Sequence, residues 1–508
     1  VMTIRKIAII GGGTSGWLAA NHLGRALKGR SGLSIAVIES PDIPIIGVGE
    51  GTVPSIRKSL QSFGISESEF IRTCDVTFKQ SIKFVNWLDQ PRHGKHNFYH
   101  HLFDIINLHQ GDAVSAWLAE QSGHFADFIS PQHLACEAAK APKLITTPEY
   151  AGVLGYAYHL NAAKFAKLLA KNAIEKFNVE HILTTVHDVC LGVDGAIESL
   201  QTERGNLSFD FYIDCSGFES ILLAKALKVP FISKAQQLFI DTALVAQIPT
   251  QPADVIPPYT KATAHQAGWI WDIALTQRRG TGFVYSSAHM NQTEAEQKFD
   301  RYLGGKLADI PHRKIPMTVG YRQQFWVKNC VALGLAQGFL EPIEATSILL
   351  TDFSARFLAE RFPANKDEVD YLSMRFNRTV NHAWERVVEF AKLHYCLSDR
   401  TDSAFWLDNQ REETIPEPLK ERLKMWKSFS PIAEDFPSKF EVFNLDNYLY
   451  VLYGMKYPTQ PHDRGLVAKA NLNAYMSNMS NMKRQMFEGL PEHRELIDKI
   501  CTYGLQAI

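Results

Sequence analysis

The fold is decided by residues 6–17, which read KIAIIGGGTSGW. An apolar run of strand type, Lys6–Ile10, leads directly into a glycine-rich turn, and a helical pattern follows over about 17–27. The next apolar run, Leu33–Ile38, ends at Glu39. This order of strand, glycine turn, helix, strand and acid predicts a βαβ unit that binds a dinucleotide.

The turn has the spacing GxGxxG. Its first glycine permits a tight turn, its second leaves room for a pyrophosphate against the backbone, and its third lets the helix pack on the strand. The phosphates are expected at the helix N-terminus, where free N–H groups and the helix dipole favour negative charge, and the acid is expected to bind a ribose diol. We therefore predict cofactor contacts from Gly11, Gly13, Thr14, Ser15, Gly16 and Glu39.

The glycine turn alone does not separate FAD from NAD, and two further features favour FAD. Residues 214–217, Asp-Cys-Ser-Gly, follow a strand-like run and resemble the later nucleotide-contacting segment of flavoproteins with two dinucleotide-binding folds. No second GxGxxG lies downstream, so the chain has no evident NAD(P)H domain of its own. We expect FAD that is reduced by another protein.

Composition excludes several classes of protein. The 508 residues include 53 Lys and Arg against 54 Asp and Glu, which gives no positive field for a nucleic acid. A hydrophobic fraction of 45% suffices for a packed core, and no apolar run approaches the roughly 18 residues of a membrane-spanning helix. The seven cysteines lack CxxC spacing, so neither a disulfide framework nor a metal site is expected, and a cytoplasmic location is predicted.

The predicted fold class is α/β: a flavoprotein core of the two-dinucleotide-binding type, a sheet-rich substrate region and a mostly helical C-terminal third. An FAD-binding core is expected over 1–350, with sheet-rich substrate segments inserted at about 85–160 and 240–315. A helical substrate-side region is expected over 351–508.

Several separated segments resemble the flavin-dependent halogenases, the tryptophan halogenase family, over most of the chain. The glycine turn is the first of them, and Gly47–Pro54 resembles the strap over the flavin. Phe78-Lys79 resembles the segment with the family's essential lysine, and Gly268–Ile273 resembles the GWxWxIP signature. Gly334–Ser347 resembles the turn that contacts flavin and halide.

The resemblance implies an FADH2-dependent halogenase with oxygen and halide, chloride or bromide, as co-substrates. Reduced FAD and oxygen would oxidise the halide to hypohalous acid, which an internal tunnel would guide to a lysine. Lysine suits this position because burial lowers the pKa of a compact amine. An electron-rich aromatic ring, an indole or an indole derivative, would be halogenated there.

The resemblance also assigns roles to residues. The catalytic pair would be Lys79 and Glu344, and the halide would bind backbone N–H groups at Thr346 and Ser347. Ser347 replaces the family's glycine, which would cost backbone freedom if φ there were positive. The substrate would contact His101, Phe103, Trp269 and Trp271, with core packing as the alternative for these four. Further flavin contacts would come from Gly49, Glu50, Gly51, Leu335 and Ile348.

Two other functions share parts of this pattern. A flavin-dependent aromatic hydroxylase would use the same first fold, and a flavin-binding sensor would keep only the glycine turn. The segment 447–455 shows no recognisable clamp for a free amino acid, so the natural substrate stays open. The expected partners are a separate NAD(P)H-dependent flavin reductase, a small aromatic substrate and a second copy of the chain in a homodimer, with neither nucleic acid nor membrane.

Overall fold

The predicted βαβ unit opens the chain in the computed structural model, which describes residues 3–43, 49–106, 113–460 and 469–507. Strand β1 (Lys6–Ile10) pairs in parallel with β2 (Ser34–Glu39) and with β12 (Phe211–Asp214). Helix α1 (Thr14–Leu27) begins earlier than the predicted Trp17. Gly13 is its extended N-cap, with φ −80° and ψ −173°, so Thr14, Ser15 and Gly16 of the predicted turn are already helical.

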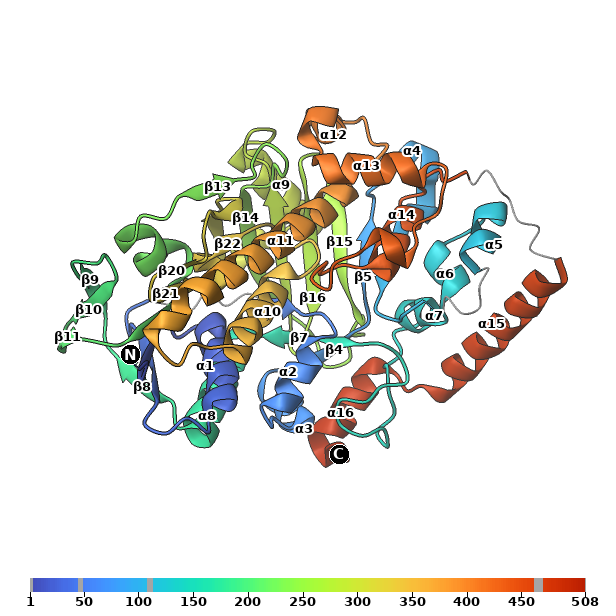
Figure 1. Cartoon of the computed structure of the whole chain (residues 1–508). Helices are drawn as coiled ribbons and strands as arrows, with labels where there is room; N and C mark the ends of the chain where they lie inside the picture. Colours follow the sequence, from blue (N-terminus) through green and yellow to red (C-terminus); the bar gives the residue numbers. More distant parts are fainter. Residues whose placement is uncertain (1–2, 44–48, 107–112, 461–468, 508) are drawn as a thin grey trace.

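Two large sheets organise the molecule. The first has six strands in the order β20 (Trp326–Val327), β21 (Cys330–Ala332), β12, β1, β2, β8 (Glu180–Leu183). The second has seven strands in the order β18 (His312–Pro316), β14 (Thr242–Pro249), β17 (Arg278–Tyr285), β16 (Gly268–Ala274), β15 (Tyr259–His265), β5 (Ser81–Val85), β6 (Phe98–Leu102). The first sheet, parallel except for its edge strand β20, is the dinucleotide-binding part, and the larger, mostly antiparallel sheet stands beside it (Figure 1).

A small sheet connects the strap segment to the lysine segment. Its strands lie in the order β3 (Gly49–Gly51), β7 (Ala157–Asn161), β4 (Thr77–Lys79), and both outer strands are antiparallel to β7. The predicted strap residues Gly47 and Val48 lie outside the described residues. There are two further small sheets. One contains β9 (Val186–Leu191), β10 (Ile197–Thr202) and β11 (Gly205–Leu207). The other contains β13 (Phe231–Ser233), β19 (Gly320–Arg322) and β22 (Gly338–Phe339).

Helices cover the sheets and make up the C-terminal third. Those before residue 350 are α1, α2 (Ile56–Ser62), α3 (Glu67–Thr73), α4 (Gln90–His93), α5 (Ala113–Glu120), α6 (Phe125–Ile129), α7 (Gln132–Glu137), α8 (Ala162–Phe177), α9 (Gln292–Tyr302) and the start of α10 (Thr346–Glu360). Those that follow are α11 (Val369–Cys396), α12 (Ala404–Asn409), α13 (Glu417–Trp426), α14 (Leu445–Gly454), α15 (Lys469–Gly489) and α16 (His493–Tyr503). Helices α10 and α11 cross the front of the molecule in Figure 1, between the dinucleotide-binding part and the C-terminal helices.

The two segments predicted as sheet-rich insertions differ in content. Segment 240–315 carries most of the seven-stranded sheet, from β14 to β18. Segment 85–160 contributes β6 and most of β7, and its remaining described residues include helices α4 to α7. The proposed division into domains therefore stays a prediction.

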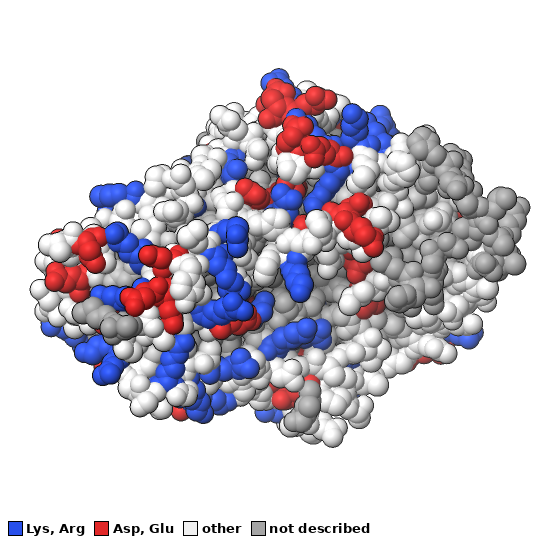
Figure 2. Space-filling model, in the orientation of Figure 1, with Lys and Arg blue, Asp and Glu red and all other residues white. Residues whose placement is uncertain are grey.

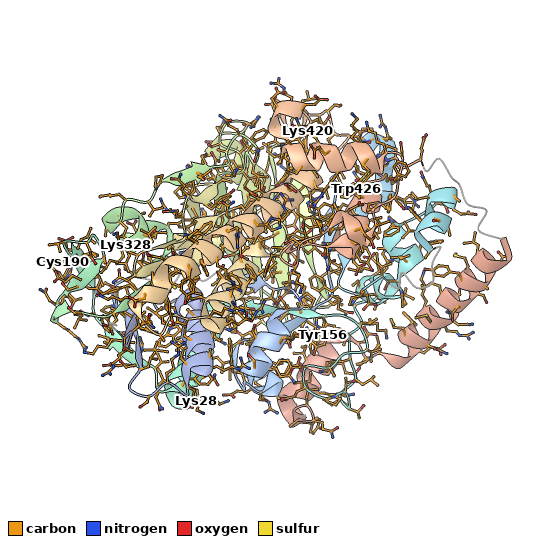
Figure 3. All side chains as sticks on the ribbon, viewed as in Figure 1. Lys28, Tyr156, Cys190, Lys328, Lys420 and Trp426 are labelled. Carbon is orange, nitrogen blue, oxygen red and sulfur yellow. The ribbon has the colours of Figure 1, made fainter. Side chains whose placement is uncertain are left out.

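A large hydrophobic core joins the two parts of the molecule. One cluster of buried side chains extends from β1 and α1 to α11 and α14, so apolar burial holds the helical third on the sheets. Figure 3 shows side chains filling the body, with Tyr156 and Trp426 inside it and Lys28 and Lys420 at its margin. On the face seen in Figure 2, Lys and Arg are interspersed with Asp and Glu. Among the described residues, no helix is long and apolar enough to cross a membrane.

Candidate active site

The glycine turn provides the cradle that a dinucleotide needs. Gly11 has a φ of +121°, and a Cβ there would lie 2.1 Å from the Cys215 carbonyl oxygen. A Cβ on Gly16 would lie 1.9 Å from the Gly11 carbonyl oxygen, so the strand and the helix approach each other closely. A Cβ on Gly13, by contrast, would meet no protein atom within 4 Å. The space predicted for a pyrophosphate is therefore open, and it lies directly at the N-terminus of α1.

This space belongs to what we call the cofactor cavity, which is lined by the glycine turn, Glu39, Thr184, Cys215 and Ser216. Glu39 ends β2, and one of its carboxylate oxygens lies 2.6 Å from His181 Nε2. The other predicted contacts Thr14 and Ser15 line the same cavity. A helix N-terminus for phosphate, an acid for a ribose and an open backbone approach fit FAD.

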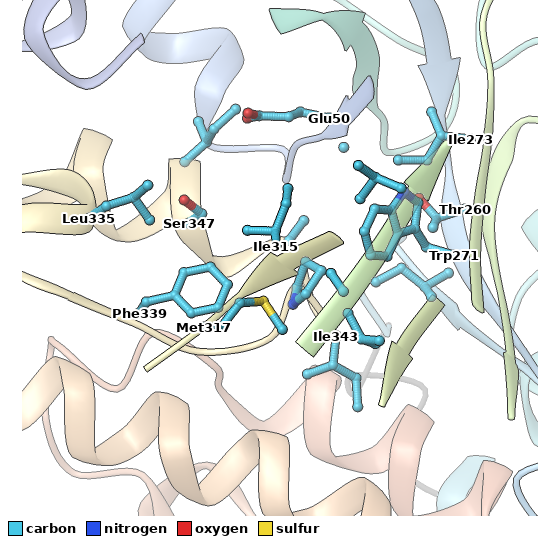
Figure 4. A pocket seen from close by; sticks show the side chains of 18 of the residues that line it. Glu50, Thr260, Trp271, Ile273, Ile315, Met317, Leu335, Phe339, Ile343 and Ser347 are labelled. Atoms are coloured by element: carbon cyan, nitrogen blue, oxygen red, sulfur yellow. The ribbon is translucent and has the colours of Figure 1, made fainter. Parts of the chain in front are cut away.

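A second cavity, here called the lysine cavity, adjoins the first. It contains Lys79, Thr260 and Trp271, and it shares with the cofactor cavity the residues Glu50, Phe218, Leu335, Ser347 and Ile348. In Figure 4, Leu335 and Ser347 lie on one side of it, and Thr260 and Trp271 lie on the other. Its remaining lining is largely apolar, so the space between the shared residues and Lys79 has mostly apolar walls.

Lys79 ends β4 and is 1% exposed. Its Nζ donates a hydrogen bond of 3.0 Å to the Thr52 carbonyl oxygen and lies 5.3 Å from the centre of the Phe103 ring. Burial lowers the pKa of Lys79 from 10.5 to about 7, although the negative charge of Glu344 acts in the opposite direction. Both the ammonium and the free amine are therefore accessible near neutral pH.

Glu344 is 2% exposed and lies between two histidines. His101 Nδ1 lies 2.9 Å from both carboxylate oxygens, and His394 Nε2 lies 2.7 Å from Oε1. Burial raises the pKa of Glu344, but the charges and hydrogen bonds of these histidines outweigh it and lower the pKa to about 2. The group is a carboxylate at neutral pH.

Both histidines use both ring nitrogens in hydrogen bonds. His394 Nδ1 lies 2.8 Å from the Phe390 carbonyl oxygen, and its Nε2 faces Glu344, so each nitrogen lies beside an oxygen acceptor. His101 Nε2 lies 2.9 Å from Asn447 Nδ2, and its Nδ1 faces Glu344.

The predicted halide turn begins a helix. Thr346 and Ser347 are the first residues of α10, so their N–H groups have no acceptor within the helix. The positive φ lies at the preceding Ala345, at 54°, and Ser347 is helical. The expected cost of a non-glycine residue therefore does not arise at Ser347. Ser347 lines both cavities, whereas Thr346 lines a small neighbouring cavity with Leu340.

The two signature tryptophans occupy different positions. Of the pair, only Trp271 is among the described residues that line the lysine cavity, and its ring packs over Gly282, where a Cβ would lie 2.0 Å from it. Trp269 is 1% exposed and donates from Nε1 to Glu341 at 2.9 Å. Trp269 is thus a core residue behind the wall that Trp271 forms.

Two of the predicted substrate residues, His101 and Phe103, contact Glu344 and Lys79. Phe103 follows β6, is only partly buried and faces Lys79. His101 is 1% exposed, and both of its ring nitrogens are hydrogen-bonded. This environment agrees with core packing, the alternative to substrate contact. Helix α14 supplies Asn447 to His101, and Tyr450 donates to the Asp104 carbonyl oxygen at 3.0 Å. A stacking role for His101 or Phe103 stays a prediction.

Sequence reasoning missed several residues of this site. His394 could have been suspected because it continues the buried face of α11 after Val387 and Ala391. No sequence signal marks His159, which lies on the strand paired with β4, or Thr260, which lines the same cavity as Lys79 from β15.

The fold and the site define a class: an FAD-binding enzyme whose cofactor cavity opens to a buried lysine beside a carboxylate. The family model described as tryptophan halogenase matches residues 6–471, and the chain belongs to this family. The predicted recognition is confirmed. The chain is an FADH2-dependent halogenase, with oxygen and halide as co-substrates, and the hydroxylase alternative is not favoured.

Relatives of known name or structure cover almost all of the chain. Tryptophan 7-halogenase RebH of Lentzea aerocolonigenes is 31% identical over 97% of this chain and 98% of its own. A tryptophan halogenase crystal structure from Shewanella frigidimarina has a TM-score of 0.95 at 36% identity, covering 100% of this chain and 99% of that one. BrvH, a flavin-dependent halogenase from Brevundimonas sp. BAL3, has a TM-score of 0.87 at 30% identity, over 98% and 99% of the two chains.

Proposed function

We propose that the chain halogenates an electron-rich aromatic ring, an indole or an indole derivative, at Lys79. One observation carries the proposal: Lys79 lines a cavity that shares five lining residues, Leu335 and Ser347 among them, with the cofactor cavity. A buried amine at the end of a walled path is the position from which a reactive oxidant can be delivered to a single carbon.

The residues would divide the reaction as follows. The cofactor, when bound in its reduced form, supplies with oxygen the oxidising equivalent that converts a halide ion into hypohalous acid. The backbone N–H groups of Thr346 and Ser347, at the N-terminus of α10, would hold the halide. The apolar walls of the lysine cavity would keep the acid from bulk water.

Lys79 would receive the acid, by hydrogen bond as the ammonium or as an amine that takes up the halogen. From the hydrogen-bonded acid, transfer to the ring forms the carbon–halogen bond, breaks the oxygen–halogen bond and leaves water. From the amine, the oxygen–halogen bond breaks first, with release of water, and the nitrogen–halogen bond breaks when the carbon–halogen bond forms. Glu344, a carboxylate held by His101 and His394, would stabilise the positive charge on the ring and accept the ring proton. Phe103 would contact the ring on the substrate side, and Trp271 would separate substrate from flavin.

A separate NAD(P)H-dependent flavin reductase would supply the reduced cofactor, as flavin-dependent halogenases require. A homodimer and a cytoplasmic location stay predictions. The names of several relatives specify tryptophan as their substrate. Because no amino-acid clamp was recognised in the segment that forms α14, we propose the indole ring itself as the element that is recognised.

The test combines purified protein, a flavin reductase, FAD, NADH and either chloride or bromide with a panel of indoles and phenols that includes free tryptophan. A mass gain of one halogen is expected on an indole. Lys79→Ala should abolish this product while flavin reoxidation continues. An oxygenated product formed without halide would point to a hydroxylase, and halogenated product from Lys79→Ala would reject the role of the lysine.

A further inference from the structure

A histidine and a threonine outside the predicted site lie beside the catalytic lysine. His159 is in β7, next to the strand that carries Lys79, and it is fully buried. Its Nε2 lies 2.7 Å from Thr260 Oγ1, and Thr260 lines the lysine cavity. Figure 4 shows Thr260 beside Trp271, at the side of the cavity away from Leu335.

The lysine amine and the threonine hydroxyl lie close enough together for one small molecule to lie near both. A Cβ built on Gly51 would lie 3.1 Å from Lys79 Nζ and 3.4 Å from Thr260 Oγ1, so these two atoms are at most 6.5 Å apart. An oxygen atom that makes one hydrogen bond to each would place them up to about 5.8 Å apart, twice an ordinary hydrogen-bond length. Gly51 keeps the space between them free of a side chain.

The hydrogen bonds of His159 decide which way the Thr260 hydroxyl points. Among the described residues, His159 Nδ1 has no hydrogen-bond partner, although it is buried. If Thr260 donated to Nε2, the histidine proton would sit on Nδ1 as an unpaired buried N–H, the more costly arrangement. With the proton on Nε2, His159 donates to Thr260 Oγ1, and the threonine O–H is left to donate into the cavity.

The charges around His159 agree with a neutral ring. Burial lowers the pKa of His159 well below 6.5, and the positive charge of Lys79 lowers it further. Lys79 itself makes one hydrogen bond within the described part of the chain, to the Thr52 carbonyl oxygen. Its remaining hydrogen-bonding capacity faces the same space as the threonine hydroxyl.

We propose that Thr260 is a further catalytic residue, which holds hypohalous acid together with Lys79, and that His159 is its positioning residue. The proposal rests on the halogenase function proposed above. The acid would lie between Lys79 Nζ and Thr260 Oγ1, with its oxygen bonded to both and its halogen free to meet the ring. Two contacts fix its orientation, whereas one contact leaves it free to rotate and escape.

The test compares Thr260→Val, which removes the hydroxyl at nearly constant volume, with Thr260→Ser, which keeps it. The first measurement is halogenated product formed per flavin reoxidised, together with free hypohalous acid captured by a diketone scavenger. We expect product per flavin to fall about tenfold in Thr260→Val, the factor that one lost hydrogen bond is worth. Scavenged acid should rise, and Thr260→Ser should restore most of the product.

Thr263→Val is the matched control, because Thr263 is a buried threonine on the same strand that is not among the described lining residues of the lysine cavity. Thr263→Val should form as much halogenated product per flavin reoxidised as the wild type. If Thr260→Val formed as much product per flavin as the wild type, the inference would be overturned and the proposed function would still stand. A wild type that halogenates nothing on the panel would end both.

The role of His159 has its own measurements. Histidine-labelled, FAD-free protein should give the Nε2–H tautomer for His159 by nitrogen NMR, assigned by loss of the signal in His159→Leu. His159→Gln keeps a donor near the position of Nε2 and should retain more product per flavin than His159→Leu. An Nδ1–H tautomer, or equal losses in the two variants, would overturn the positioning role even if Thr260→Val fails to fold.

Discussion

Replacing Lys79 with methionine should make the protein more stable while it abolishes halogenation. The fold holds the pKa of Lys79 at about 7, against 10.5 for an ordinary lysine. A lysine whose pKa is lowered on folding costs stability at every pH below 10.5, and the cost reaches its full size below pH 7. A difference of 3.5 between the values 10.5 and 7 corresponds to about 5 kcal/mol.

Methionine removes this cost but also removes favourable contacts. The hydrogen bond to the Thr52 carbonyl oxygen and the contact with the Phe103 ring are together worth about 2–3 kcal/mol. The net gain is about 2–3 kcal/mol at pH 6.5. For a chain of 508 residues the unfolding entropy converts this into a rise of about 2–3 °C in Tm.

The assay is thermal unfolding of FAD-free wild type and variant from pH 6 to pH 10. The gain should be nearly constant below pH 7 and shrink as the pH rises, because a neutral lysine no longer carries the cost of a buried charge. It should vanish at about pH 8.5, where the remaining cost equals the lost contacts, and become a loss as the pH approaches 10.5. An unchanged or lower Tm at pH 6.5, or a gain that does not vary with pH, would refute the reasoning.

Lys143→Met provides the contrast. Lys143 is also fully buried, but its Nζ lies 2.9 Å from a carboxylate oxygen of the equally buried Glu67. Removing it leaves the buried Glu67 carboxylate without its positive partner, with hydrogen bonds only from neutral donors of three tyrosines, which costs about 3–5 kcal/mol. The two lysines should therefore respond in opposite directions, because only one of them is paired by the fold.

Four further predictions test the site. Glu344→Gln should lower product formation about 100-fold at unchanged flavin reoxidation, because the charge that stabilises the cationic ring is lost; equal product rates would contradict this. His394→Phe removes a positive partner, so the pKa of Glu344 should rise from about 2 and the acid limb of the product–pH profile should move up by about one unit; an unmoved limb would exclude this role. Gly13→Val should fold normally but weaken FAD binding at least tenfold in a fluorescence titration, since the added side chain occupies only open space; an unchanged Kd would place the pyrophosphate elsewhere. Gly282→Ala should displace Trp271, because the added Cβ would lie 2.0 Å from its ring, and should lower both the Tm and the product formed per flavin. Unchanged product per flavin would mean that Trp271 does not separate the substrate from the flavin.

The cofactor part of the site could be predicted because its determinants are local. A tight turn, a close helix approach and an open backbone each need glycine at a fixed position, and the structure gives each of Gly11, Gly16 and Gly13 its expected environment. Lys79 and Glu344 were identified by resemblance to a family rather than by any local pattern. Their own neighbourhoods in the sequence do not distinguish them from surface charges.

The rest could not be read from the sequence because it depends on which strands and helices meet. His394 faces Glu344 only because α11 packs beside the start of α10, and nothing near either residue in the sequence encodes that contact. The stacking role of His101 stays a prediction, and the structure adds that both of its ring nitrogens are hydrogen-bonded within the protein, to Glu344 and Asn447. The left-handed residue of the halide turn is Ala345, one position before the predicted halide pair.

The sequence by itself determined that a dinucleotide binds at the N-terminus of the first helix, because the glycines that binding requires are neighbours in the chain. Only the tertiary structure decided that Lys79 is buried, that Glu344 carries its charge between two histidines and that Thr260 faces the same space. Burial and pairing set the pKa of each group, and both arise from segments that are far apart in the chain and meet only when the sheets and helices pack.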